Sequence, residues 1–225
     1  MKIATVQPRL SKILEQRCFF LFLALLALLI AMPFLFDIVY GRRIISFVNV
    51  MVLVTAVAAV ASSRLSFVIA IILGLPTLGF QILALQSGSP GHFALSWGFG
   101  AVFYAFTLVH LLHYVLRRDR MTADKLYGAV AAYIMVAILW AFLYGVLEYF
   151  YPGAFAFNGS AKALNVAELI YFSFTALTTA GFGDITPALI QSRFLTILET
   201  VTGVMYVAIL IARLTGVYPV VDKKP

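Results

Sequence analysis

The chain is poor in charge and almost free of cysteine. Only 11% of its 225 residues are charged, whereas 63% are hydrophobic. Soluble domains usually carry about 25% charged residues, so this composition excludes an ordinary water-soluble fold. Cys18 is the only cysteine, which excludes an internal disulfide and a thiolate metal cluster within one chain. We expect Cys18 to be a small buried residue near a membrane face.

Acidic residues are rare in the first half of the chain, and regularly spaced arginines are missing from it. Asp37 is the only acid in the first four apolar segments, and the fourth segment, residues 93–116, has no arginine. A voltage sensor needs arginines at regular intervals along one helix, so we expect no sensor of that kind. The chain also lacks a constellation of residues for covalent or metal catalysis, and we predict that it is not an enzyme.

Long apolar runs are what the sequence has instead. Runs of about 20 apolar residues match the roughly 30 Å hydrocarbon core of a bilayer. They predict six spanning helices, at residues 18–40, 44–62, 65–86, 93–116, 126–150 and 190–214. The polar break at residues 117–125 separates a four-helix unit, 18–120, from a C-terminal unit, 121–217. Residues 1–17 and 218–225 are the expected terminal segments.

The net charge of +7 is distributed in a way that indicates topology, and we expect no nucleic-acid partner. Cytoplasmic loops of membrane proteins are enriched in Lys and Arg. With both termini inside, twelve of the sixteen basic residues are cytoplasmic: Lys2, Arg9, Lys12, Arg17, Arg64, Arg117, Arg118, Arg120, Lys125, Arg213, Lys223 and Lys224. The Arg42–Arg43 pair is the main exception. We therefore predict a multi-pass protein of the plasma or inner membrane with both termini cytoplasmic.

The segment between the last two spanning helices, residues 151–189, is too long for a tight turn. Its first part reads as an extracellular turret. Asn165 then forms a good helix N-cap with Glu168 in capping-box position, and residues 165–177 predict about three helical turns, half a membrane. The strip that follows, Thr178 to Pro187, is polar and glycine-rich. Irregular backbone at membrane depth is tolerated only where it is buried in protein or lines a watery path.

This half-helix and strip carry a family resemblance. The stretch LIYFSFTALTTAGFGDITP, residues 169–187, resembles the pore helix and selectivity filter of the potassium channel superfamily, and residues 198–214 resemble the inner helix of small bacterial channels. The resemblance implies an all-α membrane protein with six transmembrane helices, a re-entrant pore helix at 165–177, a filter loop at 178–184 and a tetrameric pore. The outer helix would be 126–150 and the inner helix 190–214.

By this resemblance, backbone carbonyls of the strip bind potassium ions, and no other cofactor is implied. The implied carbonyl ligands are Thr179, Ala180, Gly181 and Phe182, with the Thr179 hydroxyl innermost. Gly181 and Gly183 are expected at positive φ, which glycine adopts without steric cost. Thr175 and Thr178 would support the filter. Asp184 would either brace it or cap a turn.

Two residues depart from the family strip. Ala180 stands where valine is usual, and Phe182 where tyrosine is usual. Neither removes a carbonyl, but alanine packs less bulk behind the filter and phenylalanine lacks a hydroxyl that could tie it in place. We predict potassium selectivity with a looser filter.

The inner helix has two residues of interest besides its apolar face. Gly203 occupies the position of the family's gating hinge, although glycine also permits close helix packing. Thr200, Gly203, Val204, Val207 and Ile211 share one face, which we assign to an inner cavity and gate. Glu199 lies at the flank of this face. It either concentrates cations in the cavity or hydrogen-bonds the end of the pore helix.

These observations predict a passive, potassium-selective channel without a voltage-sensing arginine ladder. One pore loop supplies a quarter of a filter, so the expected partners are three further copies of the chain and membrane lipid, with no small-molecule substrate. The alternatives are a weakly selective monovalent cation channel and an ion-transporter subunit with pore-loop architecture.

Overall fold

The computed structural model describes residues 17–35, 41–60, 64–117 and 122–215. Six long helices lie where the apolar runs predict them: α2 (Arg17–Leu35), α3 (Gly41–Val60), α4 (Arg64–Ser87), α5 (Pro90–Val115), α6 (Ala123–Phe150) and α8 (Ile190–Thr215). The expected first helix was extended to residue 40, and residues 36–40, with Asp37, lie outside the described residues. Residues 1–16 and 218–225 of the expected terminal segments, and the end of the second helix at residues 61–62, lie outside them as well, whereas Arg17 is the first residue of α2.

Five of these helices within the described residues are long and apolar enough to cross a membrane: α2, α4, α5, α6 and α8. In α3 the apolar part, Ile44–Ala59, is shorter. The chain is therefore a helical multi-pass membrane protein, and the sixth span remains a prediction.

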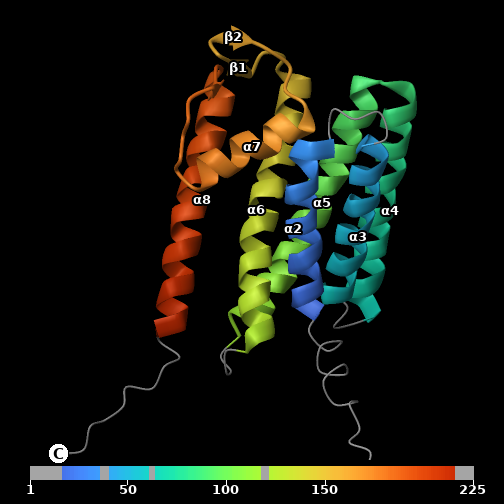
Figure 1. Cartoon of the computed structure of the whole chain (residues 1–225), viewed down its shortest axis with the longest axis vertical. Helices are drawn as coiled ribbons and strands as arrows, with labels where there is room; N and C mark the ends of the chain where they lie inside the picture. The colour runs from blue at the N-terminus through green and yellow to red at the C-terminus, as the bar shows by residue number, and fades with distance from the viewer. Residues whose placement is uncertain (1–16, 36–40, 61–63, 118–121, 216–225) are drawn as a thin grey trace, which may run out of the picture.

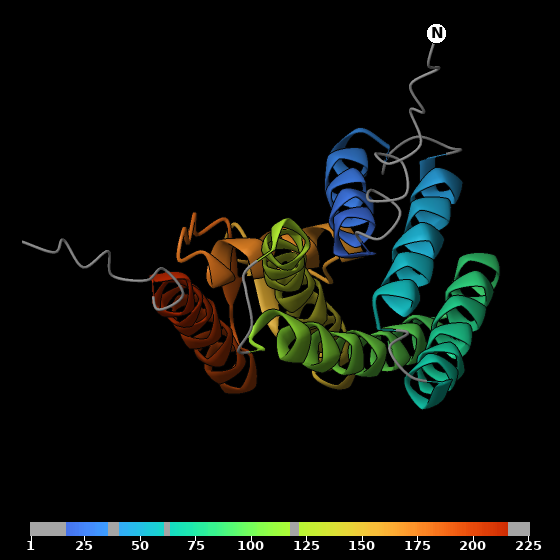
Figure 2. The ribbon, with the colours of Figure 1, turned by 90° about the horizontal axis from the view of Figure 1, so that it is seen from below.

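Helix α6 lies at the centre of the molecule. Its neighbours are α5 and α2 on one side and α7 and α8 on the other, and Figure 2 shows α8 separated by α6 from α3 and α4. Of the most apolar stretch of α6, 61% is buried, against only 11% for α8. Helix α2 begins and α8 ends at the same end of the bundle (Figure 1).

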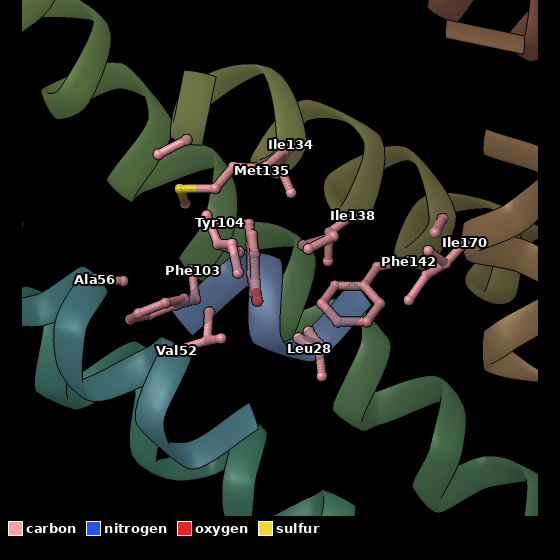
Figure 3. Packing of buried hydrophobic residues seen from close by; sticks show 14 of the residues in the cluster. Leu28, Val52, Ala56, Phe103, Tyr104, Ile134, Met135, Ile138, Phe142 and Ile170 are labelled. Atoms are coloured by element: carbon pink, nitrogen blue, oxygen red, sulfur yellow. The ribbon is translucent and has the colours of Figure 1, made fainter. Parts of the chain in front are cut away.

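One hydrophobic core joins the N-terminal helices to the pore unit. Figure 3 shows it reaching from Val52 and Ala56 of α3, past Phe103 and Tyr104, to Ile170. Cys18 is buried in this core, as expected, with its side chain against Gly128.

Glycines allow the helices of this core to approach closely. A Cβ at Gly145 would lie 2.5 Å from the Trp97 ring, and one at Gly100 would lie 2.9 Å from the Phe142 ring. Helices in a membrane gain little from the hydrophobic effect when they associate, because lipid is as apolar as their side chains. Close van der Waals packing through small residues holds them together instead.

The connection from α6 to α8 contains a half-helix and a small sheet. The helix α7 (Val166–Leu177) has Asn165 as its N-cap, and the capping box with Glu168 is complete. Strands β1 (Phe155–Phe157), β2 (Ser160–Ala161) and β3 (Ile185–Pro187) form an antiparallel sheet in the order β2-β1-β3. The fold is thus all-α apart from this three-stranded sheet, whose strands β1 and β2 lie at the expected turret and whose strand β3 is the end of the glycine-rich strip.

Candidate ion-conduction site

The strip that leaves α7 has alternating backbone conformations. Thr179, Gly181 and Gly183 have φ values of 60°, 52° and 82°, whereas Ala180 and Phe182 between them are not in the positive-φ region. The positive φ expected at both glycines is confirmed. Alternation of this kind is what turns successive carbonyl oxygens of a single strand towards one side, as a carbonyl-lined ion path requires.

The positive φ of Thr179 was not predicted from the sequence. A β-branched residue at positive φ is a conformational outlier, and such a residue costs of order 1–3 kcal/mol unless its surroundings hold it in place. The amide of Thr179 donates to the carbonyl of Ala176 at 3.1 Å. The end of the pore helix therefore fixes the start of the strip.

The pore helix also holds the middle of the strip. The amide of Gly181 donates to the Thr175 carbonyl at 3.2 Å. Thr175 itself is buried, and its hydroxyl donates to the Phe172 carbonyl at 2.8 Å. The Thr178 hydroxyl donates to the Phe174 carbonyl at 2.7 Å. Thr175 thus supports the strip through its backbone, while Thr178 completes the last turn of α7.

The exit of the strip is fixed by the sheet. The carbonyl of Asp184 accepts a hydrogen bond from the Asn158 amide at 2.8 Å, and the next three residues pair with β1 as strand β3. The Asp184 side chain lies beside Tyr171 of the pore helix. The side chain is thus placed against the pore helix, and the two expected roles of Asp184, bracing and turn capping, stay predictions.

The Phe182 ring is 72% exposed in the single chain. It stacks on Tyr171 with the ring centroids 6.3 Å apart and the planes 5° apart. Residues 178–183 are all exposed, so the strip lies on the surface of one chain.

Glu199 of α8 is fully buried behind the pore helix. Its Oε1 lies 2.5 Å from the Ser173 Oγ, and its Oε2 accepts a hydrogen bond from the Tyr144 hydroxyl. It therefore contacts the pore helix, which was one of the two expectations, but at the middle of that helix and not at its end. Ser173 and Tyr144 were not predicted as its partners.

The Ser173 hydroxyl has one proton and two close acceptors. Its Oγ lies 2.6 Å from the Ala137 carbonyl and 2.5 Å from Glu199. If the proton goes to the carbonyl, the contact with Glu199 is a hydrogen bond only when the carboxyl is the donor. If Glu199 is protonated, each polar group of this buried hydrogen-bond network has a partner, from the Tyr144 hydroxyl to the Ala137 carbonyl.

The inner helix divides into a packed stripe and an exposed face. Gly203 is buried, whereas Val204, Val207 and Ile211 are exposed and Thr200 is half-buried. Gly203 thus lies on the stripe that contacts α7, not on the face assigned to the cavity. The Leu177 carbonyl that it approaches also accepts from the Tyr133 hydroxyl at 3.4 Å. Close packing accounts for the glycine, and its role as a hinge stays a prediction.

The other end of α8 is tied to the α5–α6 connection. Arg213 Nη2 donates to the Arg117 carbonyl at 2.5 Å, and Lys125 Nζ lies 3.4 Å from the same oxygen. This contact links the end of the inner helix to the end of the four-helix unit.

The amino-acid sequence was compared with those of known protein families and proteins, and the matches agree with this geometry. Residues 130–218, which span most of α6, α7, the strip and α8, match the family described as "Ion channel". The chain is 30% identical over 157 residues to the "Voltage-gated potassium channel Kch" of Escherichia coli (strain K12), which covers 69% of this chain and 34% of that protein. No solved structure matches the chain.

The pore unit of the chain, residues 130–218, belongs to the pore-loop ion channels of the potassium channel superfamily. The chain spans about a third of the length of the curated relative that it matches. The matching family points to a channel protein, and the expectation that the chain is not an enzyme stays a prediction.

Proposed function

We propose that the chain assembles as a homotetramer that conducts potassium ions passively and selectively through a ring of four strips. The observation that carries this proposal is the alternation of φ at Thr179, Gly181 and Gly183 at the end of a membrane half-helix. A series of backbone carbonyls aimed at one path can replace the hydration shell of potassium. The proposed ligands are the carbonyls of residues 179–182 and the Thr179 hydroxyl.

Exposure of the single chain supports the tetramer. The strip and the face of α8 that includes Val204, Val207 and Ile211 are open to solvent in one chain. Four copies around an axis would enclose the four strips and place these faces together below them. The apolar residues Val207 and Ile211 could then close the path by dewetting.

A weakly selective cation channel is the second candidate. The observations that favour it are the small side chain of Ala180 and the phenylalanine at position 182, whose ring contacts Tyr171 without a hydroxyl to anchor it. The transporter-subunit alternative lacks a comparable observation, since this chain carries one such strip.

Gating in this proposal does not use an arginine ladder. Helix α5 has no arginine, and the arginines of the other described helices lie near helix ends. The name of the Escherichia coli relative describes voltage gating of that protein. The orientation with both termini in the cytoplasm rests on the basic residues near the end of the bundle where α2 begins and α8 ends.

Flux from liposomes tests the function. The purified protein is reconstituted into potassium-loaded liposomes, and potassium efflux is measured without valinomycin. Barium-sensitive efflux is expected. Efflux that persists in barium, or that equals the efflux of protein-free liposomes, would contradict the proposal. Size-exclusion chromatography with light scattering tests the tetramer, with a monomer or dimer as the contrary result.

A further inference from the structure

A cavity of about 480 Å³ lies between the four-helix unit and the pore helix. Its walls come from α2, α3, α4, α5, α6 and the first half of α7, together with the loop before α7. Figure 3 shows three of the wall residues, Leu28, Phe142 and Ile170, beside one another on α2, α6 and α7. The volume falls in the range of small-molecule sites, about 300–1,000 Å³.

The chemistry of the walls limits what can enter. Most of the lining is aliphatic or aromatic, and none of the lining side chains is charged. A charged ligand would be left without a counter-ion in an apolar setting, which is costly. The lining includes Leu85, which is 43% exposed on the outer surface of α4. Leu85 lies two residues before the end of α4 at Ser87, so one edge of the cavity is close to that end of the helix.

One pair of amides marks a polar point in this wall. Asn49 Nδ2 of α3 donates to Gln81 Oε1 of α4 at 2.9 Å, and both side chains line the cavity. Each amide has one oxygen and two N–H groups, so a single mutual hydrogen bond leaves both an acceptor and donors facing the space. Amides within a membrane are costly unless they serve packing or a site.

We propose that this cavity binds an uncharged, lipid-soluble molecule with one hydroxyl group, and that its occupancy controls the pore helix. A hydroxyl both donates and accepts, so it complements the Asn49–Gln81 pair, while the apolar remainder fills the aromatic and aliphatic walls. Other lining residues are Asn165, Val166 and Ile170, the N-cap and first turns of α7. A molecule in the cavity therefore touches the element that holds the filter strip.

The binding step does not depend on the proposed channel function, whereas the control of the pore helix does. In this proposal the four-helix unit serves to bind a ligand, which is compatible with the lack of an arginine ladder in α5. A ligand shifts a conformational equilibrium only by its difference in affinity for the two states, and here that difference would arise from contacts with α7.

Tryptophan quenching tests the binding step. Trp97 lines the cavity and Trp140 does not, so the Trp140→Phe variant leaves one reporter tryptophan. The full-length protein in nanodiscs is titrated with 11-bromoundecanol, whose bromine quenches indole fluorescence. We expect saturable quenching with an affinity at least ten-fold higher than for 1-bromoundecane, which lacks the hydroxyl. Equal, non-saturating quenching by both probes would show partition into lipid only and would overturn the proposal.

Two further variants test whether the quenching arises from binding in this cavity. Asn49→Leu removes one amide and is expected to make the two probes equal, while Ile45→Phe adds volume to the wall and is expected to abolish saturable quenching by both. Circular dichroism checks that both variants are folded. If either folded variant binds 11-bromoundecanol as the parent does, the site is elsewhere.

Potassium efflux from liposomes tests the control step. Undecanol is expected to change efflux at least three-fold in the parent protein, and not in Asn49→Leu. Unchanged efflux in a protein that conducts and binds the probe would overturn the control step alone. Absence of barium-sensitive efflux from every variant would contradict the proposed function and leave the binding result intact.

Discussion

Gly203 of the inner helix lies directly against the carbonyl of Leu177 at the end of the pore helix, so close that a Cβ at position 203 would be 2.0 Å from that oxygen. The contact joins the helix proposed to carry the gate to the helix that holds the filter. It also gives a physical reason for a glycine that, in a helix interior, costs roughly 1 kcal/mol against alanine.

Gly203→Ala is expected to destabilise the pore unit by about 1–3 kcal/mol, the usual cost of overpacking. The backbone carbonyl cannot move aside without shifting the end of α7. Thermal unfolding in detergent measures the loss, and Val204→Ala, at an exposed neighbouring position, is the control. If Gly203→Ala unfolds at the temperature of the parent protein, the close contact does not exist and the hinge interpretation gains weight.

Glu199 is predicted to act as a neutral hydrogen-bonding group behind the pore helix. Glu199→Gln, which keeps the shape and is also uncharged, should retain potassium efflux and stability. Glu199→Ala removes the carboxyl that accepts from the Tyr144 hydroxyl, at about 1–3 kcal/mol for a buried unsatisfied group, whereas the Ser173 hydroxyl keeps the Ala137 carbonyl. Thermal unfolding and efflux are measured together. A large loss in Glu199→Gln with normal folding would show that the charge itself is needed, as a cavity charge would be.

Gly181→Ala places an L-residue at φ 52°. The left-handed conformation costs an L-residue roughly 1–2 kcal/mol, and four copies meet in one proposed ring. Potassium efflux is expected to fall at least ten-fold while the tetramer remains. Gly79→Ala is the matched control, because that glycine has open space around it and no positive φ. Equal efflux from the two variants would remove the strip from the ion path.

Phe182→Tyr is expected to raise selectivity for potassium over sodium. The added hydroxyl supplies a hydrogen-bonding anchor that the stacked phenylalanine lacks, and a firmer filter discriminates better between ions of different size. Reversal potentials under bi-ionic conditions, compared with those of the parent protein, measure the change. A lower selectivity in Phe182→Tyr would contradict the view that the native filter is loose.

Features fixed by local pattern were predictable from the sequence. The long helices follow from apolar length, and the start of α7 follows from Asn165 and Glu168, whose capping box needs only neighbouring residues. The positive φ of Gly181 and Gly183 follows from the steric freedom of glycine. In each case the determining residues lie within a few positions of one another.

Features set by contacts between residues far apart in the sequence could not be predicted in this way. The positive φ of Thr179 depends on its hydrogen bond to the end of α7, against its own preference. The partners of Glu199 are 55 and 26 residues away. Likewise, the helical wheel placed Gly203 on the cavity face because periodicity cannot tell which side of α8 meets the pore helix.

A single-channel recording across a planar bilayer, with potassium on one side and sodium on the other, tests whether the chain forms a potassium-selective pore. We expect unitary currents blocked by barium, with a reversal potential that shows potassium to be the more permeant ion. Opening should not depend steeply on voltage, because α5 has no arginine. A permeability ratio near one, or no unitary current from the intact tetramer, would contradict the proposed function.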